Sequence, residues 1–153
     1  MSGRVRRWGG SAGSVSVEFA AAAGPVLLAT IAVMIAAGRI VLADHVVTDA
    51  ATAAARTASL ARTASLARTA THAHHTATTT AHRVLTEQQL HCRSITITID
   101  TSGFTAPPGL PATVSATVTC VAELSDLALP GLPGTRILRD TFTSPLDPFR
   151  GRT

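Results

Sequence analysis

Glu18 has the most distinctive chemical setting in the sequence, because it stands at the edge of a long apolar stretch. Residues 19–38 read FAAAAGPVLLATIAVMIAAG and carry no charge over 20 positions. If this stretch enters a membrane, a carboxylate directly before it is energetically costly, so it needs a charged partner or a functional role. Glu18 is therefore a candidate functional residue whose role depends on how the stretch is used.

A group of histidines is the second candidate for chemistry. His72, His74, His75 and His82 lie in the polar segment THAHHTATTTAH of residues 71–82. A specific zinc site needs three or four fixed ligands supported by outer hydrogen bonds, and no Asp, Glu or Cys lies within the segment. We therefore expect no specific metal site and no cofactor, and only adventitious metal binding at these histidines.

The third candidate is the pair Cys92 and Cys120, the two cysteines of the chain. An even pair outside the cytoplasm is typical of a disulfide, whereas a metal or catalytic thiol role lacks support without a CxxC motif. The bond would close a loop of about 29 residues and stabilise the fold by about 2–4 kcal/mol.

Motifs of known catalytic sites are missing from the sequence. It has no nucleophile elbow, no HExxH and no phosphate-binding glycine loop, and its acidic residues are scattered. We therefore expect the chain not to be an enzyme.

The apolar stretch is predicted to be a membrane-spanning helix. At about 1.5 Å per residue, its 20 residues reach about 30 Å, the thickness of a bilayer's hydrocarbon core. The alternative is a buried core helix. That alternative needs a large surrounding core, which a chain with only 3% aromatic residues does not supply.

Charges on either side of the stretch predict its orientation. Arg4, Arg6 and Arg7 precede it without an acid, whereas Asp44 follows it closely. By the positive-inside tendency the N-terminus is cytoplasmic and the C-terminal part is extracytoplasmic, as in a single-pass protein of the cell membrane. A secretory signal peptide cut after Ala43 is the alternative, but the apolar run exceeds the usual 7–15 residues.

The net charge of +4 does not indicate nucleic acid as a partner. All 13 basic residues are arginine and three of them lie in residues 1–13, whereas residues 44–153 carry nine Arg and eight Asp or Glu. The bulk of the chain is therefore nearly neutral. The lack of Lys, Asn and Tyr indicates a GC-rich genome.

The junction before the apolar stretch resembles the leader of type IV pilin-like proteins. Residues 13–19 read GSVSVEF after an Arg-rich leader. With Pro25, Gly38-Arg39 and an Ala-rich continuation to Arg56, the segment looks like that of TadE-like pseudopilins of the tight-adherence pilus system. An ordinary anchor in which Gly13 and Glu18 coincide with the motif by chance is the alternative.

The resemblance implies a processing step and a set of partners. A prepilin peptidase would cut between Gly13 and Ser14, making Glu18 the fifth mature residue, followed by Phe19. The Glu18 carboxylate would then pair with the new amine of a neighbouring subunit, which offsets two costly charges and fixes the axial register. Implied partners are the membrane, the peptidase, other pilin-like subunits and the inner-membrane platform.

Residues 44–82 are predicted to form a helical stalk. The hexapeptide ARTASL begins at Ala55 and recurs up to Ala70. Six residues at 100° each place successive arginines on different faces, so the repeat forms neither a basic stripe nor an apolar seam. We interpret it as lengthening a solvated stalk, and the β-branched and polar residues 71–82 predict that the helix frays there.

Residues 83–153 are predicted to form a small antiparallel sheet. Segment 94–100 (SITITID) alternates strictly between apolar and polar positions, and segment 113–124 (TVSATVTCVAEL) is a second alternating strand. Residues 136–144 are a candidate third strand.

The register of the first two strands stays open. Direct pairing of Cys92 with Cys120 would place Ile95 opposite Thr117 and mix the faces. A bulge, or a Cys92 that precedes the ladder, would place Ile95 opposite Ala116 or Val118.

These patterns together predict an α+β protein with a basic leader at 1–13, a membrane-inserting helix at 14–43, a helical stalk at 44–82 and a β-rich portion at 83–153. The function they favour is that of a minor pilin-like protein acting in assembly of a tight-adherence pilus or related secretion machinery. The alternative is a single-pass or secreted cell-surface binding protein.

Overall fold

The structure is a computed structural model that describes residues 12–61, 66–107, 109–127, 131 and 133–147. The side chains of residues 12–18, 20 and 66–69 lie outside that description. By its contacts the chain divides into two compact units, Met1–Ile35 and Ala36–Thr153.

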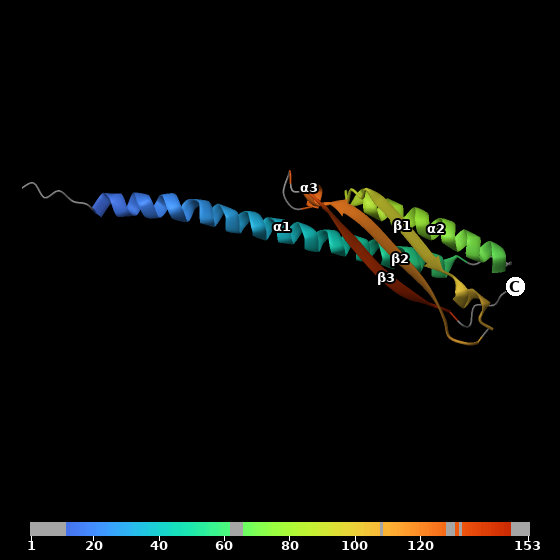
Figure 1. Cartoon of the computed structure of the whole chain (residues 1–153). Helices are drawn as coiled ribbons and strands as arrows, with labels where there is room; N and C mark the ends of the chain where they lie inside the picture. The colour runs from blue at the N-terminus through green and yellow to red at the C-terminus, as the bar shows by residue number, and fades with distance from the viewer. Residues whose placement is uncertain (1–11, 62–65, 108, 128–130, 132, 148–153) are drawn as a thin grey trace, which may run out of the picture. The chain divides into compact units, whose positions relative to one another are not determined.

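The elements follow one another in an α+β order (Figure 1). They are α1 (Ala12–Leu60), α2 (Leu66–Glu87), β1 (Ser94–Asp100), the 3-10 helix η1 (Ser102–Thr105), β2 (Ala112–Glu123), α3 (Leu124–Leu127) and β3 (Thr135–Leu146). The predicted class, a long N-terminal helix followed by further helix and a small antiparallel sheet, is confirmed.

The sheet has the order β1-β2-β3, with both pairs antiparallel. Alternation sends most apolar side chains of the central strand β2 to one face, where Val114, Val118 and Cys120 are fully buried. The opposite face carries mainly Thr and Ser hydroxyls, and Thr117 and Thr141 on neighbouring strands are hydrogen-bonded through them at 2.8 Å.

The register places Ile95 opposite Cys120, and Ile97 opposite Val118. The expected sharing of faces is therefore confirmed, but the expected partners of Ile95, Ala116 or Val118, are wrong. Cys92 precedes the ladder, and a bend at Arg93 carries it back toward the sheet.

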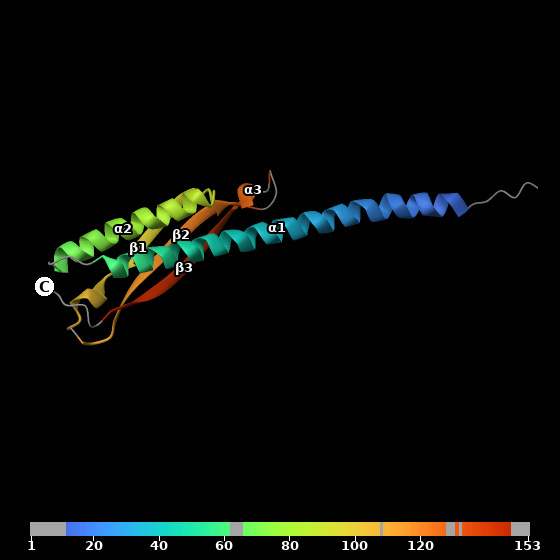
Figure 2. The same cartoon turned by 180° about the vertical axis from the view of Figure 1, so that it is seen from behind.

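Two helices cover the apolar face of the sheet (Figure 2). The part of α1 within the second unit and α2 share one hydrophobic core with the strands. Most helix residues in this core are alanines, whose small side chains allow close packing. The buried alanines of the two helices are Ala43, Ala50, Ala51, Ala54, Ala55, Ala58, Ala73, Ala77 and Ala81.

The expectation that residues 71–82 fray is wrong, because α2 is helical from Leu66 to Glu87. Ala77 and Ala81 recur at a spacing of four and are fully buried, which anchors one face of the helix. Thr76 and Thr79 donate their hydroxyls to carbonyls four residues earlier, over 2.8 and 2.9 Å, so their polar groups do not oppose the helix.

The expected solvated stalk is also wrong in the described residues. α1 ends at Leu60, before most of the hexapeptide repeat, and α2 is a separate helix. Both helices bury an alanine face against the sheet, so this region is part of the folded core.

The connection between β1 and β2 is held by close backbone contacts. Phe104 of η1 is buried, and a Cβ on Gly103 would collide with the carbonyl oxygen of Thr113. The backbone N–H of Ser102 donates to the Asp100 carboxylate over 2.9 Å, which lowers the pKa of that carboxyl group.

Candidate functional site

The candidate site is the apolar surface of α1. Phe19 is 75% exposed and Leu28 is 69% exposed, and the other large apolar residues of α1 up to Leu42 are exposed as well, except Ile40, which is half-buried against the core. Its most apolar window has a mean hydropathy of 2.4, with 6% of the window buried within the chain. By length and composition α1 can therefore cross a membrane. The core-helix alternative is not supported in the described residues, because no core of this chain covers that surface.

The residues predicted for processing and assembly lie at the beginning of this helix. Gly13 and Ser14 belong to the first turn of α1. The side chains of Ser14 and Glu18 lie outside the described residues, so cleavage between Gly13 and Ser14 and the ion pair of Glu18 stay predictions. Phe19 is exposed, as a residue that contacts lipid or a neighbouring helix needs to be.

Cys92 and Cys120 form the predicted disulfide. Their Cα atoms lie 5.4 Å apart, within the usual range for such a bond. Because Cys120 is fully buried in the central strand, the bond fastens the segment before β1 to the middle of the sheet.

Sequence reasoning missed the contacts between α1 and β3. Arg136 Nη2 lies 3.5 Å from Asp44 Oδ2, and the Arg56 guanidinium lies over the Phe142 ring, 5.9 Å from its centroid. No local signal identifies these partners. The apolar face of α1 did have a signal, because Val47 and the buried alanines follow helical spacing.

The histidine group does not form a cluster of metal ligands in the described part of the chain. His72, His74, His75 and His82 are all exposed on α2. Among the described residues, no three His, Cys, Asp or Glu side chains come close enough together to hold a metal ion.

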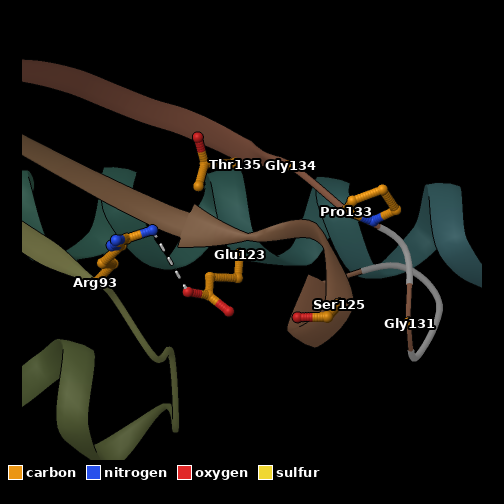
Figure 3. A pocket seen from close by; sticks show the side chains of 7 residues that line it. All are labelled: Arg93, Glu123, Ser125, Gly131, Pro133, Gly134 and Thr135. Carbon is orange, nitrogen blue, oxygen red and sulfur yellow. Dashed lines mark ion pairs between the residues drawn. The ribbon is translucent and has the colours of Figure 1, made fainter.

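An open pocket of about 400 Å³ lies at the end of the sheet where β2 leads into α3 (Figure 3). Arg93 Nη1 and Glu123 Oε1 face each other there across 3.9 Å, and both side chains are largely solvated. The pair is therefore a surface ion pair, which contributes little stability. Its lining residues are Arg93, Glu123, Ser125, Gly131, Pro133, Gly134 and Thr135.

Comparison with known families gives one match to the N-terminal part of the chain. Residues 13–56 match the family described as TadE-like protein. This segment is TadE-like. The resemblance inferred from the junction at Gly13 is thereby confirmed over these residues. Comparison with curated proteins and with solved structures found no match.

The TadE-like segment is longer than the apolar stretch. It begins at the predicted cleavage junction and ends at Arg56, within the part of α1 that packs on the sheet. The TadE-like segment thus supplies both the helix that can cross a membrane and one wall of the folded core.

Proposed function

We propose that the chain is a minor pilin-like protein, anchored in the membrane by α1, that takes part in assembly of a tight-adherence pilus or related secretion machinery. One observation carries this proposal: the TadE-like match coincides with a helix whose large apolar side chains are exposed. Such a surface is stable only in lipid or against other apolar helices. The proposed role is assembly, not catalysis.

In the proposed topology the N-terminus lies in the cytoplasm and the sheet lies outside it. Arg4, Arg6 and Arg7 favour this orientation through the positive-inside tendency. The Cys92–Cys120 disulfide supports it independently, because disulfides persist in oxidising compartments.

Processing would remove the basic leader and create a pairing site. A prepilin peptidase would cut between Gly13 and Ser14, and the new amine would pair with Glu18 of an adjacent pilin-like subunit. In the low dielectric of the membrane this pair offsets two charges and sets the register between subunits. The inner-membrane platform is the expected site of assembly.

The secreted alternative requires a cut after Ala43. Ala43 is buried in the core, and α1 continues through it to Leu60. A cut there would fall inside a helix that packs on the sheet, which favours the anchored protein over the secreted one.

Sequencing the N-terminus of the mature protein, from cells that carry a tight-adherence system, separates these possibilities. We expect Ser14. An N-terminus at Asp44 would establish secretion, and one at Met1 or Ser2 would establish a simple anchor and overturn the proposed processing.

Substitutions separate processing from assembly. Replacement of Gly13 should abolish processing, whereas Glu18→Ala should leave processing intact and abolish assembly. Glu87→Gln, at an exposed carboxylate that pairs with Arg83 on α2, is the matched control and should affect neither. Wild-type assembly by Glu18→Ala would remove the proposed ion pair.

A further inference from the structure

One end of the sheet lies close to the point where α1 leaves the apolar stretch. The beginning of β3 lies beside α1, where Arg136 and Asp44 form an ion pair at 3.5 Å. Asp44 follows Arg39, the first charge after the apolar stretch, by five positions, or about 7.5 Å along the helix axis. All these residues belong to the second unit, so the distance is set within one compact body.

That distance corresponds to the depth of lipid headgroups. A bilayer is about 30 Å thick in its hydrocarbon core and about 40–45 Å with its headgroup regions, which leaves about 5–8 Å on each side. If the hydrocarbon core ends near Arg39, the beginning of β3 lies within the headgroup region.

The side chains at this end fit such an environment. Ile137 of β3 is 68% exposed, and it is the exposed large apolar side chain among the described strand residues. The sheet face that it belongs to carries mainly hydroxyl groups. Val41 and Leu42 on α1 are exposed as well. Arg136 pairs with Asp44 and Arg93 pairs with Glu123, whereas Arg139 is an exposed cation two positions after Ile137 on the same face. A cation there suits headgroups that carry phosphate.

We propose that this end of the sheet rests on the membrane surface, with Ile137 among the lipid headgroups and the half-exposed Arg136 within reach of lipid phosphates. This inference rests on the proposed anchoring by α1. The contact would fix the height of the second unit above the bilayer, and with it the level at which the sheet meets other subunits.

Fluorophores attached to single introduced cysteines test the contact in the full chain. The two native cysteines are joined in the disulfide, so a new thiol is labelled alone while that bond stays oxidised. Ile137→Cys is the reporter. Thr143→Cys is the matched control, because it lies on the same face of β3 and about 20 Å farther along the strand. Leu28→Cys, within the apolar stretch, reports anchoring by α1.

The measurement uses nanodiscs of phosphatidylethanolamine and phosphatidylglycerol, with lipids that carry a quencher on either the headgroup or the acyl chain. We expect headgroup quenching to be several-fold stronger at position 137 than at position 143, and acyl-chain quenching at position 28. Arg139→Cys, between the two sites on the same face, should give an intermediate value and serves if Ile137→Cys does not fold.

The possible outcomes distinguish this contact from the anchor. Quenching at position 28 with equal, weak quenching at 137 and 143 overturns the contact and leaves the proposed function standing. A label at 137 that is shielded from water but unaffected by lipid quenchers indicates a protein neighbour and also overturns it. No acyl-chain quenching at position 28 overturns the anchor and this contact together.

Discussion

The Ser144 hydroxyl donates a hydrogen bond to the Ser59 hydroxyl over 3.1 Å and thereby connects β3 to α1. Ser59 in turn donates to the carbonyl of Arg56 over 2.8 Å. Ser144 is 6% exposed, and among the described residues it is the polar residue that is buried with the hydrophobic core. Ser144 therefore needs Ser59 as its acceptor, whereas Ser59 donates to Arg56 and does not need Ser144.

Ser59→Ala should therefore cost more stability than Ser144→Ala. Without Ser59 the buried Ser144 hydroxyl loses its acceptor, which costs about 1–3 kcal/mol, whereas without Ser144 the Ser59 hydroxyl keeps its bond to Arg56. The double variant should resemble Ser144→Ala. Denaturant unfolding of the full chain in detergent, followed by circular dichroism, measures these differences. Equal costs for the two single variants would contradict the direction of the bonds.

Ala54→Leu should destabilise the second unit. Ala54 is fully buried between α1 and the sheet, and the added side-chain volume costs about 1–3 kcal/mol in a packed core. Leu60→Ala, at an exposed position of the same helix, is the control and should change the free energy of unfolding by less than about 0.5 kcal/mol. If Ala54→Leu unfolds like the wild type, α1 does not pack on the sheet through this face.

The double variant Cys92→Ala/Cys120→Ala should lower the free energy of unfolding by about 2–4 kcal/mol. Loss of the disulfide releases the loop that it closes, which spans 28 positions. Thermal unfolding with and without reductant provides the control, because reductant should destabilise the wild type and leave the variant unchanged. An equal effect of reductant on both proteins would mean that the reductant destabilises the protein by some route other than this disulfide.

Gly103→Ala should destabilise the connection between β1 and β2, because the new Cβ would collide with the Thr113 carbonyl and the backbone of one segment would have to move. We expect a cost of about 1–3 kcal/mol. Gly38→Ala is the matched control, since a Cβ there meets nothing and alanine favours a helix. Hydrogen exchange at Phe104 and its neighbours would locate the effect, and protection equal to that of the wild type would rule it out.

The faces of the sheet could be predicted from the sequence, but its register could not. The alternation of Ile95, Ile97 and Ile99 determines which side of β1 faces the core, since successive side chains point to opposite sides. Sliding β1 by two positions preserves that pattern, so alternation cannot distinguish Ala116, Val118 and Cys120 as the partner of Ile95. The bend at Arg93 lets Cys92 reach Cys120 with Ile95 in this register, and that bend has no clear sequence signal.

The helices show a similar division between local and tertiary signals. Apolar length identifies the exposed part of α1, because that part packs on no other described element of the chain. The persistence of α2 through its Thr- and His-rich residues depends on burial of Ala77 and Ala81 against the sheet, and helix propensity alone does not contain that contact. The spacing of these alanines by four was the available signal. The Asp44–Arg136 contact joins residues 92 positions apart and had none.

The redox state of the two cysteines also reports whether a molecule has reached an oxidising compartment. β1 is an edge strand, bonded on one side to β2, and the Cys92–Cys120 bond fastens the segment that leads into it. A reducing cytosol does not allow that bond to persist, so the fastened sheet is completed only after the chain has been exported under the proposed topology. The sheet would therefore mature later than the anchor. The thiol state of the cysteines would then show, molecule by molecule, which copies have crossed the membrane and are ready to assemble.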